Sequence, residues 1–217
     1  MENTEKAYNS RSLIKSKKRV ADHGEVFTPP WLVEAMLDLT EESDRIEARF
    51  LEPACGNGNF LIRVLQRKLA VVELKSRKSS NDRKSLALIA VMSIYGIELL
   101  EDNIIECRKR LLSVFADYLK IEPLDELYRA ASRILSLNLI HGDALKMRTY
   151  DNLPIVFSEW EYMGRGTFRR RDFQFDLLAQ KTRGGRDTIE PIRAYAPTTL
   201  RELVAHSTNS REREVAL

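Results

Sequence analysis

The sequence has few of the residues on which several common kinds of site depend. It contains only two cysteines, Cys55 and Cys107, and three histidines in 217 residues. The cysteines do not have the spacing of metal ligands, and two cysteines are too few for a disulfide framework. We therefore expect a reduced, cytoplasmic protein without a metal.

Long apolar segments are also missing. The longest apolar run covers residues 86–100, is too short to span a bilayer and carries Glu98. The first ten residues, MENTEKAYNS, are too polar for a signal peptide. We expect no membrane partner. The chain is 43% hydrophobic with a formal net charge of +3, which suits one domain with a core and permits, without requiring, a nucleic-acid partner.

Strand-like and helix-like patterns alternate through the middle of the chain. Strands are predicted over residues 49–52, 93–99, 137–145 and 153–157, and a loop over 76–85. Helices are predicted over residues 29–39 with Thr28 as N-cap, 58–76, 85–92, 101–119 and 125–135. This alternation predicts an α/β fold with a parallel sheet. After Met163 we expect no run of strands.

The chain divides into three parts by composition. Residues 1–23 form a basic arm with a cluster at Lys15, Lys17, Lys18 and Arg19, which in the simplest interpretation is solvated. Residues 24–162 carry the alternating pattern. Residues 163–217 form a basic and aromatic extension followed by a polar tail.

Residues 50–60, FLEPACGNGNF, place two glycines directly after a predicted strand. Ligands of open parallel sheets bind at this end of the strands. Gly56 and Gly58 remove side chains where a ligand would approach the backbone, and either can adopt a positive φ angle. Turn formation alone is the competing explanation.

The next two predicted strands end in acidic residues. Glu98 can accept hydrogen bonds from two ribose hydroxyls, or can serve as a negative charge before a helix. Asp143 can accept a hydrogen bond from an adenine amino group, or can cap a Gly-Asp turn. Taken together, the three strand ends favour an adenosine-type ligand.

The two common nucleotide motifs are absent, because no G-x-G-x-x-G follows the first strand and no G-x-x-x-x-G-K-S/T occurs. Glu52, just before the glycines, instead suits a cationic amino-acid group. An adenosine joined to a methionine fits this pattern, so we expect S-adenosylmethionine as the cofactor.

These segments resemble the N6-adenine DNA methyltransferases, the family that includes the modification subunits of type I restriction systems. The resemblance covers residues 24–147 in the family's order: GEVFTPPWLVEAMLDL, FLEPACGNGNF, IYGIELLEDNI and LIHGDALKM. It implies a Rossmann-like methyltransferase fold and a restriction-modification function. It also implies a cofactor site lined by Phe27, Thr28, Pro29, Glu52, Pro53, Ala54, Gly56, Gly58, Phe60, Glu98 and Asp143.

The family's catalytic tetrapeptide, Asn-Pro-Pro-Tyr or Asn-Pro-Pro-Phe, is missing. Its acceptors activate the amino group of a flipped adenine, and its aromatic ring stacks on that base. The corresponding place here reads SEWEY, where Ser158 is the candidate acceptor and Trp160 or Tyr162 the candidate stacking residue. The predicted sheet is also incomplete on its C-terminal side. We expect either a methyltransferase that depends on a partner subunit or a non-catalytic cofactor-binding or regulatory subunit of a DNA-modification or phage-defence complex.

Basic and aromatic residues interleave after residue 163. Arg165, Arg169, Arg170 and Arg171 alternate with phenylalanines in a pattern that can hold phosphates and stack on bases. The competing explanation is a strand whose aromatic side chains are core and whose arginines are solvated. DNA is therefore the expected macromolecular partner.

Overall fold

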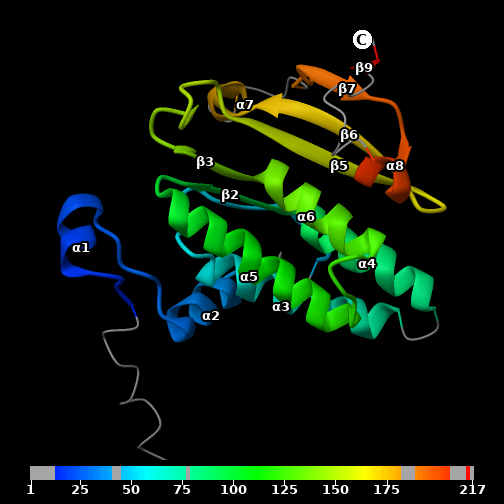
Figure 1. Ribbon diagram of the computed structural model, residues 1–217, viewed down its shortest axis with the longest axis horizontal. Coiled ribbons are helices and arrows are strands. Elements are labelled where there is room, and N and C mark those ends of the chain that lie inside the picture. Colours follow the sequence, from blue (N-terminus) through cyan, green and yellow to red (C-terminus); the bar gives the residue numbers. More distant parts are fainter. Residues whose placement is uncertain (1–12, 41–44, 77–78, 182–188, 206–213, 216–217) are drawn as a thin grey trace, which may run out of the picture.

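The computed structural model describes residues 13–40, 45–76, 79–181, 189–205 and 214–215 (Figure 1). The helices are α1 (Lys17–His23), α2 (Pro30–Asp38), α3 (Asn59–Lys75), α4 (Ser80–Met92), α5 (Glu101–Leu119), α6 (Glu126–Asn138), α7 (Phe175–Lys181) and α8 (Leu200–Ala205). The strands are β1 (Phe50–Glu52), β2 (Ile94–Glu98), β3 (Leu139–Asp143), β4 (Arg148–Thr149), β5 (Val156–Gly164), β6 (Thr167–Gln174), β7 (Arg193–Tyr195), β8 (Thr198–Thr199) and β9 (Glu214–Val215).

The first sheet has the order β1-β2-β3-β4. Strands β1, β2 and β3 are parallel, and β4 pairs antiparallel with β3 at one edge. Parallel neighbours need a crossover, which α3 and α4 supply between β1 and β2, and α5 and α6 between β2 and β3. The carboxyl ends of β1, β2 and β3 therefore lie at one end of the sheet.

Helices and a second sheet cover opposite faces of the parallel strands (Figure 1). On the helical side, Ile94 of β2 belongs to a large apolar core with residues of α3, α4, α5 and α6. On the other side, Tyr95 and Ile97 pack with Ile155 and Phe157. Because side chains alternate along a strand, β2 is buried on both faces, in keeping with its apolar residues Ile94, Tyr95 and Ile97.

The second sheet is antiparallel, in the order β5-β6-β7-β9 with β8 paired to β6. Its main feature is the long hairpin of β5 and β6, which turns through Gly164, Arg165 and Gly166. The α/β class and the parallel strands are thus as predicted. The prediction that residues 153–157 continue the parallel sheet is wrong, because β5 pairs only with β6 among the described strands.

The prediction of no strands after Met163 is also wrong. Strand β6 alternates between inward and outward positions, but its inward residues include Arg170 and Asp172 beside the apolar Phe168. These two polar side chains pair with each other in the interior, so a pattern that counts only apolar residues does not find the strand.

Two predicted helix starts differ from the structure. The N-cap of α2 is Pro29 and not Thr28, and no side chain caps this helix. Helix α4 begins at Ser80, within the predicted loop, because Ser79 Oγ accepts a hydrogen bond from Asp82 N at 3.2 Å. Polar residues in the first turn of a capped helix can be mistaken for a loop.

Candidate ligand-binding site

A cavity of about 500 Å³ lies at the carboxyl ends of β1, β2 and β3. Its walls contain nine of the predicted cofactor residues, namely Phe27, Thr28, Glu52, Pro53, Ala54, Gly56, Phe60, Glu98 and Asp143. Pro29 and Gly58 are not among the lining residues. The topology brings the three predicted strand ends to one cavity of a size typical for ligands.

Glu98, at the end of β2, is the polar centre of this cavity. Its Oε2 accepts a hydrogen bond from Gly56 N at 2.8 Å, which ties the glycine loop to the strand. Its Oε1 accepts from Leu100 N at 3.0 Å and from Asn103 Nδ2 at 3.3 Å. Because a carboxylate oxygen can accept two hydrogen bonds, Oε2 keeps capacity for one more donor.

The two glycines of the loop have different roles. Gly56 has φ +53°, and a Cβ there would lie 3.2 Å from the Phe27 ring at the cavity wall. Gly58 has φ +93°, and a Cβ there would lie 2.8 Å from Cys107 Sγ of α5. Gly58 therefore permits close packing of α3 on α5, whereas Gly56 permits the approach of the loop to Phe27.

Glu52, at the end of β1, is the acidic residue of the cavity with the fewest partners. Within the described part of the chain its only hydrogen bond is a long one, from Ala54 N to Oε1 at 3.4 Å. Burial raises the pKa of this carboxyl group above its ordinary value. A positively charged ligand group would offset the cost of ionising Glu52 in this place.

Asp143, at the end of β3, is held by its own turn. Its Oδ1 accepts hydrogen bonds from Leu145 N at 3.0 Å and Lys146 N at 3.1 Å, and its Oδ2 lies 3.1 Å from Lys146 Nζ. These contacts with the backbone and side chain of Lys146 lower the pKa of Asp143. Asp143 therefore caps its own turn, as one of the two interpretations of the sequence predicts. Its Oδ2 atom can still accept one more hydrogen bond.

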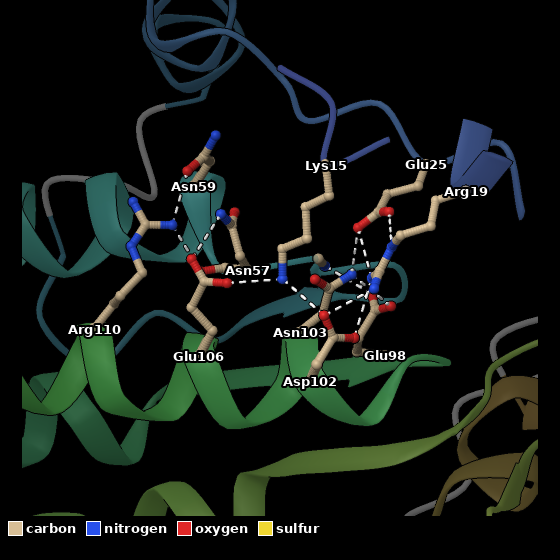
Figure 2. A network of polar contacts seen from close by, with 11 residues as sticks. Lys15, Arg19, Glu25, Asn57, Asn59, Glu98, Asp102, Asn103, Glu106 and Arg110 are labelled. Atoms are coloured by element: carbon tan, nitrogen blue, oxygen red, sulfur yellow. Dashed lines mark hydrogen bonds and ion pairs between the residues drawn. The ribbon is translucent and has the colours of Figure 1, made fainter. Parts of the chain in front are cut away.

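Residues 13–27, here called the N-terminal strap, lie along the start of α5 (Figure 2). Lys15 Nζ lies 2.9 Å from Asp102 Oδ2 and 2.8 Å from Glu106 Oε2. Arg19 forms ion pairs with Asp102 at 2.8 Å and with Glu25. The expectation of a solvated arm is therefore wrong for Lys15 and Arg19.

The strap also forms part of the cavity wall. Its residues His23, Gly24, Glu25, Val26 and Phe27 line the cavity. Phe27 N donates to Leu13 O at 2.8 Å, which joins the two ends of the strap. Sequence reasoning missed this element, although the spacing of Lys15 and Arg19 matches that of Asp102 and Glu106.

Two asparagines of the cavity wall were also missed. Asn103 donates to Glu25 Oε1 at 2.8 Å and to Glu98 Oε1, and Asn57 donates to Glu106 Oε1 at 3.2 Å. The Oδ1 atoms of both asparagines are buried and accept no hydrogen bond from the described residues. The available signal for Asn103 was a polar residue within the buried stripe of α5.

The candidate catalytic residues, Ser158 and Trp160, do not line the cavity. Strand β5 starts near the carboxyl end of β3, where Ile155 packs close to Ala144. It then runs the other way, so that Trp160 Nε1 donates to Oδ1 of Asn138, the residue just before β3, at 3.3 Å. The structure thus places Trp160 at the opposite end of the parallel strands from the cavity.

Ser158 belongs to a buried hydrogen-bond network in the second sheet. Its Oγ donates to Asp172 Oδ1 at 2.9 Å and accepts from Arg170 Nε at 2.9 Å. Tyr195 Oη donates to Asp172 Oδ2 at 3.0 Å. These contacts give Ser158 a structural role between β5 and β6.

Three of the four candidate DNA-binding arginines have acidic partners. Arg170 is only 12% exposed and pairs with Asp172 at 2.8 Å. Arg169 pairs with Glu161 at 2.6 Å, and Arg171 with Glu159 at 2.6 Å, each across the hairpin. Within the described ranges only Arg165, in the hairpin turn, lacks such a partner. Pairing with acidic residues leaves little free positive charge on this hairpin.

Comparisons with protein-family models, curated proteins and solved structures found no match for this chain. No group of three or more acidic, histidine or cysteine side chains suited to a metal occurs in the described residues. Among the described helices, none has the length and apolar character needed to cross a membrane.

Proposed function

We propose that this chain is an S-adenosylmethionine-binding subunit of an N6-adenine DNA methyltransferase of the restriction-modification type. In this proposal another chain supplies the residues that activate the target adenine. The observation that carries it is the convergence of Glu52, Glu98 and Asp143 on one cavity beside a glycine loop. The order of these elements along the chain is the order in the family that the sequence resembles.

The residues present fit the parts of this cofactor. Glu98 Oε2 has one acceptor position left for a ribose hydroxyl, and Asp143 Oδ2 has one left for the adenine amino group. The under-partnered carboxylate of Glu52 suits the positively charged methionine part. When bound, the cofactor would supply an electrophilic methyl group.

The need for another chain follows from the direction of β5. The sequence contains no Asn-Pro-Pro-Tyr or Asn-Pro-Pro-Phe. Of the substitute candidates, Trp160 lies at the far end of the parallel strands, hydrogen-bonded to Asn138, and Ser158 lies in the buried network between β5 and β6. In our proposal, DNA contacts and base activation come from a partner subunit.

A second candidate function is a cofactor-sensing regulatory subunit without a role in methyl transfer. The observation that favours it is the internal pairing of Arg169, Arg170 and Arg171, which leaves few cations for a phosphate backbone. Both candidates require the same cavity to bind the cofactor, and they differ in whether a methyl group reaches DNA when the partner is present.

The first prediction tests binding by titration calorimetry with S-adenosylmethionine and S-adenosylhomocysteine. We expect Glu98→Ala to weaken binding by about 1.5–3 kcal/mol, the scale of hydrogen bonds to a charged group. Glu101→Ala is the matched control, because Glu101 lies in the same region but outside the cavity wall. Absence of binding by the folded wild-type chain would refute both candidate functions. Circular dichroism would show whether each variant is folded.

A further inference from the structure

The amide group of Asn103 has a fixed orientation. This residue lies in the first turn of α5 and is only 1% exposed. Its Nδ2 donates to Glu25 Oε1 at 2.8 Å and to Glu98 Oε1 at 3.3 Å. Because ionised carboxylates only accept hydrogen bonds, the nitrogen must face the two glutamates, and the opposite end of the amide must be the oxygen.

The oxygen of this amide needs a donor. Asn103 Oδ1 is buried and accepts no hydrogen bond from the residues that the structure describes. Buried polar atoms in folded proteins nearly always have a partner. Asn103 is also part of the cavity wall, which brings a ligand bound there next to this residue.

Three protein donors near this amide are already engaged. Gly56 N and Leu100 N both donate to Glu98, and the Arg19 guanidinium donates to Glu25 and Asp102. Glu98 Oε2, on the carboxylate bonded to Asn103, still has room for one donor. One hydrogen-bonded pair of side chains thus offers two acceptors, one neutral and one charged.

Two acceptors on one hydrogen-bonded pair of side chains match a ligand with two neighbouring hydroxyl groups. We propose that Asn103 is a specificity-determining residue that, with Glu98, recognises the neighbouring 2′- and 3′-hydroxyls of a ribose. One hydroxyl donates to Glu98 Oε2 and the other to Asn103 Oδ1. This inference rests on the proposed function, since it concerns the ribose of the same ligand.

The strap contributes to this recognition through Glu25. Glu25 holds one hydrogen of the Asn103 amide, and Arg19 in turn holds Glu25. The strap therefore keeps the amide nitrogen turned away from the ligand and its oxygen available. Glu25 is a positioning residue in this arrangement.

The experiment compares S-adenosylhomocysteine with its 2′-deoxy and 3′-deoxy forms by titration calorimetry. For the wild-type chain we expect removal of either hydroxyl to weaken binding by about tenfold or more, as for the loss of one hydrogen bond to a site built for it. In Asn103→Ala, we expect the loss of affinity caused by removing one of the two hydroxyls to fall to about twofold or less. The loss caused by removing the other hydroxyl, which we assign to Glu98, should remain.

Asn57→Ala is the matched control. Asn57 also lines the cavity with a buried, unpartnered Oδ1, but its nitrogen is held by Glu106 and not by Glu98. This variant can change the overall affinity, but we expect it to keep both hydroxyl penalties. Loss of a penalty in Asn57→Ala, with both retained in Asn103→Ala, would overturn the assignment to Asn103.

A measurement on the wild-type chain covers the case in which Asn103→Ala does not fold. The side-chain carbonyl ¹³C resonance of Asn103 should shift on binding S-adenosylhomocysteine and should not shift with one of the two deoxy forms. Equal shifts with all three compounds would overturn the inference while leaving cofactor binding intact. Absence of binding by any of the compounds would instead refute the proposed function itself.

Discussion

Glu52 is the residue that we expect to face the positively charged group of the proposed ligand. Its carboxyl group is partly buried, has one long hydrogen bond from Ala54 N within the described residues, and has a pKa raised by burial. A cation binds the ionised form only. Affinity for a cationic ligand is therefore full above the raised pKa and is lost as the pH falls through it.

We accordingly predict that binding of S-adenosylmethionine weakens towards acidic pH and that Glu52→Gln removes this dependence. At neutral pH the variant should bind about tenfold or more weakly, because it lacks the charge that faces the ligand cation. Calorimetry at a series of pH values from acidic to neutral checks this dependence. A Glu52→Gln profile as steep as that of the wild type would contradict the prediction, and Glu101→Gln serves as the control.

For single residues, the sequence predicted which side chains line the cavity better than it predicted which residues they contact. Nine of the predicted cofactor residues line the cavity. Gly58 was assigned to the ligand because it is one of the two glycines of the loop motif, yet its missing Cβ makes room for Cys107 of another helix. Asn103 was missed because its role depends on Glu25, a residue 78 positions away in the chain. Contacts at such separations leave no local pattern.

Among the elements, the N-terminal strap is the one whose attachment depends most on charge. Lys15 and Arg19 join it to Asp102 and Glu106 on α5. The contact with Arg19, followed by that with Lys15, lowers the pKa of Asp102 to about 2. Since this folded-state pKa lies below the ordinary value, the attachment is complete above the ordinary value and is lost as the pH falls towards about 2.

We predict that Arg19→Ala loosens the strap and that added salt does the same in the wild type. The readout is amide hydrogen exchange of residues 13–27, which we expect to become about threefold to tenfold faster, because partly exposed ion pairs are individually weak and screened by salt. Lys18→Ala is the control, since Lys18 pairs with Asp22 inside α1. Unchanged exchange in Arg19→Ala would show that the backbone contact between Phe27 and Leu13 holds the strap by itself.

The elements also show why the second sheet was harder to predict than the first. Strand β2 is buried throughout and apolar up to Glu98, and it lies between the end of α4 and the acidic first turn of α5, so its pattern is plain. Strand β6 has two polar side chains, Arg170 and Asp172, at inward positions. They form hydrogen bonds with each other and with Ser158 of β5. Polar side chains of this kind can be buried only when they form hydrogen bonds with one another, and the sequence alone does not show these bonds.

For the whole molecule, the direction of β5 decides what the isolated chain can do. A strand that continued the parallel sheet would carry Ser158 and Trp160 towards the cavity. In the structure β5 leaves the cavity end near Ala144 and reaches Asn138 and Ser93 at the other end. The α/β class was predictable from the alternation of elements, but the direction of this strand depends on its hairpin with β6, which was not predicted.

We therefore predict that the isolated chain transfers methyl groups to duplex DNA very slowly or not at all, even when the cofactor is bound. The adenine amino group is a poor nucleophile, and the loss of preorganised acceptors typically slows such a step by on the order of a thousandfold. The measurement is tritium transfer from labelled S-adenosylmethionine to DNA of mixed sequence, with Ser158→Ala and Trp160→Ala as comparison variants. Both should leave the background unchanged, once thermal melting has shown that the network around Asp172 tolerates them. Rapid transfer by the wild-type chain that either substitution abolishes would mean that β5 does form the active site. Transfer that begins only when a second subunit is added would support the shared active site, because the cavity described here would then supply the cofactor and the other chain the acceptors.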